Sequence, residues 1–421
     1  LEFRRVLFRS NLIKMSKKIV INKNKNKNKN KMKFIDLFSG IGGFHIALSK
    51  LGHKCVLACD IDKKCREIYE KNYGISPCDD IRKIDEKTMV NFDILCAGFP
   101  CQSFSNAGNK NAFEDKIRGT LFFDIIRIAK EKKPKFMFLE NVKHIKKIDD
   151  GSVFNTILGA LDEIGYHIED DKQVFELSPN QLGIPQDRKR IIFVCIRKDI
   201  YDSTKVIDLD LDENIEIKFD NILETNVDIK YKVKPEIEQL FNIWDEIISQ
   251  MEIGQKMSPT ILCNEFHSNY TEEEFNQLPQ WKQDYINKNK PIYIKYKELW
   301  DSWYEINKDI LSKKEINGKL EWQAGPLKEN DSIWNHFIQV RQSGIRVKKN
   351  KFFPTLVAIV QTPIYGKEKR YITPRECARL QSFPDTFILH ENDNVAYKQF
   401  GNAVNVDVVY RVMSKTLELY K

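Results

Sequence analysis

One segment near the start of the chain constrains the fold most, because it has the pattern of a buried strand that passes through a glycine turn into a helix. The apolar run Lys33–Phe38 is typical of a buried strand, and Ser39–Gly43 contains three glycines. Ile46, Ala47 and Leu51 then keep helical spacing. Glycine lets the backbone come close to a ligand, and a helix N-terminus offers unpaired N–H groups. The segment therefore predicts an α/β fold with a ligand at this turn.

Acidic residues end the next elements of this pattern. A second apolar strand, Cys55–Cys59, leads into Asp60, twenty residues after Gly40. A carboxylate at this place can accept hydrogen bonds from both hydroxyls of a ribose. A third acidic turn follows at Asp79–Ile81. The pattern indicates an adenosine-containing cofactor, and by itself it leaves NAD and S-adenosylmethionine as alternatives.

A cysteine follows another buried strand. The run Asp93–Ala97 leads into Gly98–Gln102, where Cys101 stands between a rigid proline and a glutamine. Open α/β sheets place ligands at the carboxyl ends of their strands, and a thiolate there is a strong nucleophile. The alternative is that Cys101 is a small buried hydrophobic residue. Residues 103–119 are rich in Gly, Asn, Ser and charge, so we expect a mobile loop.

Two further groups are expected near the cysteine. Glu140 follows the strand Lys135–Leu139, and a carboxylate there would share the crevice of Cys101, although a solvent-exposed turn acid is the commoner outcome. Between two later strands, alternation places Gln186, Arg188 and Arg190 on one side of the chain. These side chains form a fork of donors suited to phosphate or carbonyl oxygens.

The region 201–370 differs in composition and contains all six tryptophans, which indicates a second domain. Within it, residues 341–351 hold five basic side chains and no acid. Arg341, Gln342 and Arg346 are candidates for reading base edges, because Arg suits guanine and Gln suits adenine. A solvated basic face is the alternative for the lysines of this segment.

The basic charge of the chain lies mostly in its N-terminal tail. Residues 1–33 hold twelve Lys and Arg and one acid, so the rest of the chain carries −3 of the total of +8. The first ten residues resemble translated adapter sequence, and we expect the native start at Met15 or Met32. The Asn/Lys tract that ends at Lys31 has no apolar face, so we expect disorder there.

Cysteine usage and hydropathy exclude some classes of protein. The nine cysteines are scattered without paired CxxC spacing, which indicates reduced thiols in a cytoplasmic protein and neither a disulfide framework nor a metal site. No run of eighteen apolar residues occurs, so we expect no membrane span. We expect a monomer.

Six sequence blocks together resemble the motif set of bacterial DNA (cytosine-5)-methyltransferases of the type II modification class. The resemblance covers about residues 33–200 and 370–421, in the order and spacing of the family. The blocks are Asp36–Phe44, Gly98–Gln102, Glu140–Val142, Gln186-x-Arg188-x-Arg190, Arg375–Leu380 and Gly401–Val404.

The resemblance implies S-adenosylmethionine as methyl donor, S-adenosylhomocysteine as product and a flipped-out cytosine in double-stranded DNA as acceptor. Cys101 would be the nucleophile and Glu140 the acid that holds the cytosine. Arg188, with Arg190 behind it, would orient the base. Gln102, Ser105 and Arg118 would contact DNA. The positions that line up with cofactor contacts are Phe38, Gly40, Gly42, Asp60, Ile61, Asp80, Ile81, Pro100, Leu121 and Asn402.

The chain departs from its relatives at two places. Ile61 stands where relatives often have an aromatic residue against the adenine, so aliphatic packing replaces stacking. Lys116 and Ile117 lengthen the loop before Arg118, which leaves the phosphate role of that arginine less defined.

The resemblance also implies a fold and an order of domains. We expect a Rossmann-like, seven-stranded methyltransferase sheet with an inserted, smaller target-recognition domain. The expected segments are a tail at 1–31, a catalytic and cofactor-binding domain at 32–200, a target-recognition domain at 201–370, and a hinge with return to the catalytic domain at 371–421.

Three other functions remain as alternatives. An RNA cytosine-5-methyltransferase would share the sheet and the cysteine, but the long inserted region favours duplex DNA. A nicotinamide-dependent dehydrogenase would explain only the glycine turn and Asp60. An inactive DNA-binding homologue is disfavoured because the expected catalytic side chains are present. A cognate restriction endonuclease is a possible partner in the same system.

Overall fold

The computed structural model describes residues 31–100, 121–212, 214–359 and 361–421. Its internal contacts divide the chain into two units. Unit 1 comprises the described residues up to Leu177 together with Lys189–Leu211 and Ala403–Lys421. Unit 2 comprises Ser178–Arg188 and Asp212–Asn402. Both units are therefore discontinuous in sequence, and their bounds differ from the segment ends at 200 and 370 expected from composition.

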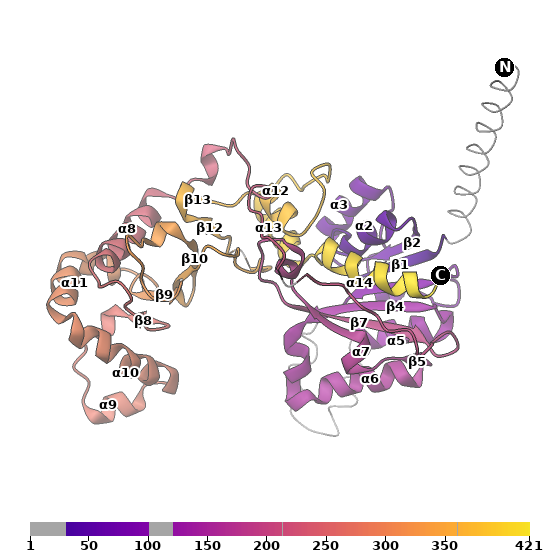
Figure 1. The fold of residues 1–421 in the computed structure, drawn as a ribbon, viewed down its shortest axis with the longest axis horizontal. Helices are drawn as coiled ribbons and strands as arrows, with labels where there is room; N and C mark the ends of the chain where they lie inside the picture. The colour runs from indigo at the N-terminus through magenta and orange to yellow at the C-terminus, as the bar shows by residue number, and fades with distance from the viewer. Residues whose placement is uncertain (1–30, 101–120, 213, 360) are drawn as a thin grey trace, which may run out of the picture. The chain divides into compact units, whose positions relative to one another are not determined.

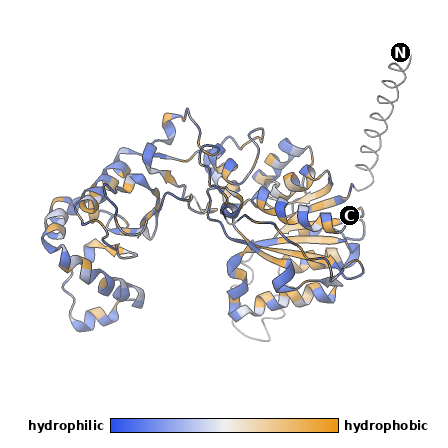
Figure 2. Ribbon diagram, viewed as in Figure 1, coloured by the Kyte–Doolittle hydropathy of each residue, from blue (hydrophilic) through white to orange (hydrophobic). Residues whose placement is uncertain are grey.

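Unit 1 is built on a seven-stranded sheet with the order β2-β1-β3-β4-β7-β5, to which β6 adds by pairing with β7. Strands β1 to β4 run parallel to one another, whereas β4, β5 and β6 pair antiparallel with β7. This is the seven-stranded sheet that the family resemblance implied, and Figure 2 shows hydrophobic residues concentrated along its strands. The strands are β1 (Lys33–Leu37), β2 (Lys54–Cys59), β3 (Ile94–Gly98), β4 (Phe136–Val142), β5 (Tyr166–His167), β6 (Val174–Leu177) and β7 (Arg190–Arg197).

Helices cover both faces of this sheet (Figure 1). On one face, α5 and α6 pack on alternate strand residues such as Leu37, Leu95 and Leu139, all fully buried. The helices α2, α3 and α14 lie on the other face, where the alternate strand side chains point. Phe34 of β1, for example, contacts His45 of α2. The helices of unit 1 are α2 (Gly43–Lys50), α3 (Lys63–Tyr73), α5 (Leu121–Lys132), α6 (Ser152–Glu163), α7 (Asp170–Gln173) and α14 (Val406–Leu419).

Unit 2 has its own six-stranded sheet, with the order β13-β12-β10-β11-β9-β8. Strands β10 and β11 form an antiparallel hairpin, and β11 runs parallel to β9. The strands are β8 (Ile261–Leu262), β9 (Lys319–Gln323), β10 (Phe337–Arg341), β11 (Gly344–Lys348), β12 (Ile364–Tyr365) and β13 (Arg370–Tyr371).

An aromatic core holds unit 2 together. Trp244 of α8 and Trp300 and Trp303 of α11 are buried and contact one another edge-on or tilted, with ring centroids 5.2 to 6.5 Å apart. Trp281 is the exception, because half of its surface is exposed. The helices of unit 2 are α8 (Pro235–Ser249), α9 (Glu272–Gln277), α10 (Gln280–Lys295), α11 (Lys297–Leu311), α12 (Pro374–Leu380) and α13 (Asp393–Asn402).

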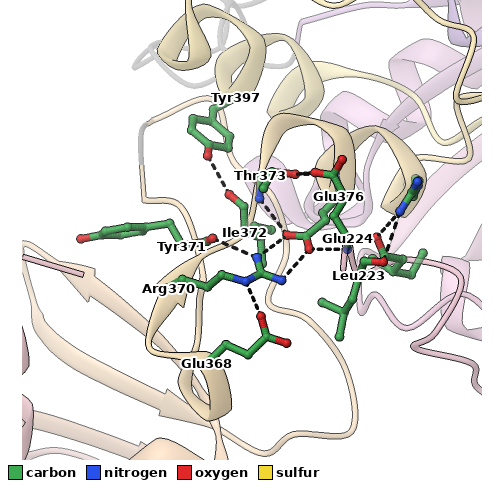
Figure 3. A network of polar contacts seen from close by, with 11 residues as sticks. Leu223, Glu224, Glu368, Arg370, Tyr371, Ile372, Thr373, Glu376 and Tyr397 are labelled. Atoms are coloured by element: carbon green, nitrogen blue, oxygen red, sulfur yellow. Dashed lines mark hydrogen bonds and ion pairs between the residues drawn. The ribbon is translucent and has the colours of Figure 1, made fainter. Parts of the chain in front are cut away.

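A buried ion pair fixes the start of α12 in unit 2 (Figure 3). The Arg370 guanidinium donates two hydrogen bonds to the Glu376 carboxylate, at 2.7 and 2.8 Å, and neither side chain is more than 3% exposed. Glu376 also accepts from the main-chain N–H groups of Thr373 and Glu224, at 2.8 and 2.9 Å. Burial of two charges is tolerated when their remaining hydrogen-bonding capacity is satisfied, as it is here.

A helix that crosses a membrane must be both long and apolar. None of the described helices in either unit meets both requirements.

Candidate functional site

The glycine turn after β1 has a backbone that only flexible residues adopt readily. Gly40 and Gly42 have φ of +52° and +88°, and Phe38, at the start of the turn, has φ of +52°. A Cβ on Gly40 would meet no heavy atom within 4 Å, whereas one on Gly42 would lie 2.4 Å from the Tyr73 ring. Gly40 therefore borders open space, and Gly42 is required by a neighbouring side chain.

The acid that follows β2 is fixed against this turn. Asp60 accepts hydrogen bonds from the N–H of Gly40 at 2.7 Å and from the N–H of Asp62 at 2.8 Å. Burial raises the pKa of Asp60, and these two backbone donors oppose the rise. Each carboxylate oxygen has a second lone pair for a ligand. The next side chain, Ile61, is 74% exposed.

The third acidic turn lies at the start of a short 3-10 helix, η1 (Ile81–Lys83). Asp80 accepts from the N–H of Arg82, and the Arg82 guanidinium holds the pKa of Asp80 down to about 2. Ile81 is buried in the core of unit 1. In unit 1 the glycine turn and Asp60 are thus in direct contact. Asp80 lies in the next acidic turn along the sequence, just before η1.

The predicted acid at the end of β4 stands next to an arginine. Glu140 lies near the carboxyl end of β4, opposite Gly98 of β3, and not in a solvent-exposed turn, which was the alternative. Its side chain is 11% exposed, and Oε1 lies 3.0 Å from Nε of Arg190. Arg190 reaches this position because the first residue of β7 pairs with the last residue of β4. The pair marks the carboxyl end of β3, three residues before Cys101.

Arg188 has a different environment from Arg190. Its buried guanidinium donates to the carbonyl oxygens of Leu356 at 2.5 Å and Gly401 at 2.9 Å, all within unit 2. Gln186 is also buried in unit 2. Gln186 and Arg188 thus belong to unit 2, whereas Arg190 belongs to unit 1. Within unit 1, Arg190 contacts Glu140.

Sequence reasoning missed the role of Asn141. Its side-chain N–H donates to the carbonyl oxygen of Phe99 at 2.9 Å, and its own oxygen accepts from the N–H of Val142 at 2.8 Å. This bridge joins the end of β4 to the segment that leaves β3, so it fixes the chain just before Pro100. An amide side chain at the carboxyl end of a buried strand, next to an expected catalytic acid, was the available signal.

The other expected site residues are spread over the chain. Pro100 is exposed, and Leu121 is the partly buried first residue of α5. Asn402 ends α13 in unit 2 and is exposed. Four further residues lie outside the described ones: Cys101, Gln102, Ser105 and Arg118.

The expected base-reading residues surround the β10–β11 turn in unit 2. Gln342 is exposed in the turn itself. Arg341 and Arg346 both approach Glu321 of β9, whose Oε2 lies 3.5 Å from Nη1 of Arg341 and 2.6 Å from Nε of Arg346. Ser343 donates to the other oxygen of Glu321 at 2.7 Å. One nearly buried carboxylate therefore holds both arginines and the turn.

Comparison with known proteins gives a consistent result. The family model described as C-5 cytosine-specific DNA methylase matches residues 32–418. The chain is 32% identical to the type II methyltransferase M.HhaI of Haemophilus parahaemolyticus, over 90% of this chain and 92% of that protein. It is 34% identical to the type II methyltransferase M.BanI of Aneurinibacillus aneurinilyticus, over 91% of this chain and 95% of that protein.

Solved structures share the fold at lower identity. A prophage-encoded protein of E. coli, described as a DNA modification methyltransferase, superposes with a TM-score of 0.55 at 21% identity, over 92% of this chain and 99% of its own. The S. pombe Dnmt2 methyltransferase gives a TM-score of 0.51 at 20% identity, over 92% and 99%. At these identities the likeness supports the Rossmann-like architecture alone.

Proposed function

This chain belongs to the C-5 cytosine-specific DNA methylase family, and from that premise we propose that it methylates a flipped-out cytosine through a covalent bond from Cys101. The donor in this proposal is S-adenosylmethionine, and the cytosine lies in a specific site of duplex DNA. The observation that carries the proposal is the Glu140–Arg190 pair at the carboxyl ends of β3 and β4. The type II class of its relatives leads us to place the enzyme in a restriction-modification system, with a cognate endonuclease as partner.

Cytosine C5 needs activation because the ring is aromatic and poor in electrons. Addition of the Cys101 thiolate to C6 breaks the C5–C6 double bond and makes C5 nucleophilic. Cys101 lies outside the described residues, and its assignment rests on the sequence that follows β3. After methylation, loss of the C5 proton and release of the Cys101 sulfur restore the double bond.

Glu140 and Arg190 are suited to the polar edge of the base. A protonated Glu140 donates to N3 and offsets the negative charge that develops there during attack at C6, and its other oxygen accepts from the exocyclic amine. Arg190 fixes the orientation of the carboxyl group and adds donors for the carbonyl oxygen of cytosine. We assign this role to Arg190 and give Arg188 the task of tying together main-chain segments of unit 2.

The residues around the glycine turn fit a nucleoside cofactor. Gly40 borders open space that a Cβ would enter, Asp60 has lone pairs for ribose hydroxyls, and exposed Ile61 offers an apolar surface for the adenine. Phe38, Gly42, Asp80 and Ile81 are the other residues of unit 1 that we assign to this site. We assign cofactor contacts to Pro100, Leu121 and Asn402 from the family resemblance alone. When bound, S-adenosylmethionine supplies the methyl group that C5 takes.

Access to the base requires that the nucleotide leave the duplex, at a cost of a few kcal/mol. We assign DNA contacts to Gln102, Ser105 and Arg118 from their place after Cys101 in the sequence. For base reading we propose Arg341, Gln342 and Arg346. The contacts of Glu321 support this, because they hold two guanidinium groups in place before DNA arrives.

Labelled methyl transfer tests the proposal. The purified protein with labelled S-adenosylmethionine should label duplex DNA and leave tRNA unlabelled. Bisulfite sequencing of DNA from an expressing host should then give one recurring sequence context, which is the target site. Label in tRNA alone would favour the RNA methyltransferase, and a lack of label in both would contradict the proposal.

A further inference from the structure

Tyr73, the last residue of α3, contacts the main chain of the glycine turn through its hydroxyl group. Its hydroxyl donates to the carbonyl oxygen of Ile41 at 2.9 Å and approaches that of Gly42 at 3.3 Å. We propose that Tyr73 is a positioning residue that sets the shape of the turn for the methyl donor. This inference rests on the proposed function, because it assumes that the turn receives S-adenosylmethionine.

The hydroxyl acts on the peptide planes of the turn. A peptide unit is planar, so a fixed carbonyl also fixes the direction of the N–H that follows it. The Ile41 carbonyl accepts from Tyr73, and the next N–H, that of Gly42, donates to Ser39 at 2.8 Å. The Gly42 carbonyl also accepts the first hydrogen bond of α2, from the N–H of Ile46 at 3.0 Å. Tyr73 therefore links the turn to the start of α2.

The ring of Tyr73 occupies the space that Gly42 leaves. A Cβ on Gly42 would lie 2.4 Å from Cε2 of Tyr73 and 2.7 Å from its hydroxyl oxygen, closer than real contacts allow. Since φ of Gly42 is +88°, glycine is required here both for its backbone and for its lack of a side chain. The two residues fit together, so a change at Tyr73 reaches the turn directly.

A group of three side chains behind Tyr73, called here the supporting layer, holds its ring in place: His45, Tyr69 and Asp36. The ring stacks on His45 of α2, with centroids 3.9 Å apart and planes 13° apart. Nδ1 of His45 lies 2.7 Å from the hydroxyl of Tyr69, and that hydroxyl donates to buried Asp36 at 3.4 Å. Burial lowers the pKa of His45 to about 4, so the stacked imidazole is neutral near pH 7. His45 therefore orients the Tyr73 ring as an uncharged stacking partner.

The variant Tyr73→Phe isolates the hydroxyl, because it keeps the ring in contact with Gly42 and His45. Tyr166→Phe is the matched control. Tyr166 belongs to β5, at the edge of the sheet opposite to β2, and its buried hydroxyl donates to the carbonyl oxygen of Pro134 at 2.7 Å. Both variants lose a hydroxyl that donates to a main-chain carbonyl, from a partly buried site at Tyr73 and a buried site at Tyr166. They differ in whether that carbonyl belongs to the glycine turn.

Calorimetric titration with S-adenosylhomocysteine, which needs no turnover, measures the effect. We expect Tyr73→Phe to weaken binding about 3- to 10-fold, the range for loss of one such hydrogen bond, and to raise KM for S-adenosylmethionine by the same factor with kcat little changed. Tyr166→Phe should bind as the wild type does. Equal affinities of Tyr73→Phe and wild type, or an equal loss in both variants, would overturn the inference. A wild type that binds no S-adenosylhomocysteine would instead refute the proposed function.

Discussion

Replacement of Arg188 by methionine should mainly reduce stability, whereas replacement of Arg190 by methionine should mainly reduce methyl transfer. Methionine keeps an unbranched apolar side chain at the position and removes the guanidinium group. Arg188 is 3% exposed and donates to two main-chain carbonyls, so Arg188→Met removes two charge-assisted hydrogen bonds in the interior of unit 2. Each is worth about 1.5 to 3 kcal/mol, so we expect the free energy of unfolding to fall by about 3 to 6 kcal/mol.

Arg190 should affect catalysis more than stability. Its side chain is 18% exposed at the carboxyl end of β4, where solvent can replace part of its contact with Glu140. We expect Arg190→Met to lower the free energy of unfolding by only about 1 to 2 kcal/mol. Methyl transfer should fall on the order of 10²-fold, as when one donor that stabilises developing charge is removed.

Urea unfolding followed by tryptophan fluorescence measures stability, because five of the six tryptophans are buried in the core of unit 2. Methyl transfer is measured on folded protein well below the unfolding midpoint. Wild-type methyl transfer by Arg190→Met would refute the assignment. So would Arg188→Met with wild-type stability and lost methyl transfer, because that result would return the base-orienting role to Arg188.

Two further predictions concern the layer behind the glycine turn and the β10–β11 hairpin. His45 has a pKa of about 4 in the folded chain and about 6.5 when unfolded, so the unfolded state binds more protons between these values. The free energy of unfolding should therefore fall by about 3 kcal/mol as the pH drops from 6.5 to 4. In a plot of the urea midpoint against pH, His45→Gln should be flatter than the wild type over this range. The same slope in both proteins would contradict a lowered pKa of His45. Glu321→Gln should release Arg341 and Arg346 and lower discrimination between target and non-target duplexes roughly tenfold in fluorescence anisotropy, since a bidentate arginine contact is worth about 1 to 3 kcal/mol. Lys351→Gln is the control, which should weaken binding to both duplexes alike; unchanged discrimination in Glu321→Gln would argue against the hairpin as the reader.

Much of unit 1 could be predicted from local sequence. Parallel strands buried on both faces read as continuous apolar runs, and the runs before the glycine turn, Asp60 and Gly98 became β1, β2 and β3. The strand before Glu140 was placed correctly but ended too early, because Glu140 and Asn141 are polar and yet belong to β4. Their burial depends on β3 and β7, which pair with β4 on either side.

The environment of the arginines could not be predicted in the same way. Alternation assumes a continuous strand from Gln186 to Arg190, but β7 begins only at Arg190, and Gln186 forms an isolated bridge with Phe353. The contact of Arg346 with Glu321 depends on the parallel pairing of β11 with β9, across 25 residues of sequence. The stacking of His45 on Tyr73 likewise joins two helices. Short-range periodicity carries no information about such contacts.

The covalent bond from Cys101 is tested most directly by a trapping experiment. A duplex with 5-fluorocytosine at the methylated position cannot lose a C5 proton, so release of the enzyme after methylation is blocked. With S-adenosylmethionine present, we predict a denaturant-resistant protein–DNA adduct whose attached peptide contains Cys101, and no adduct with Cys101→Ala. Absence of the adduct in a wild-type protein that methylates the unfluorinated duplex, or attachment through another residue, would contradict the account.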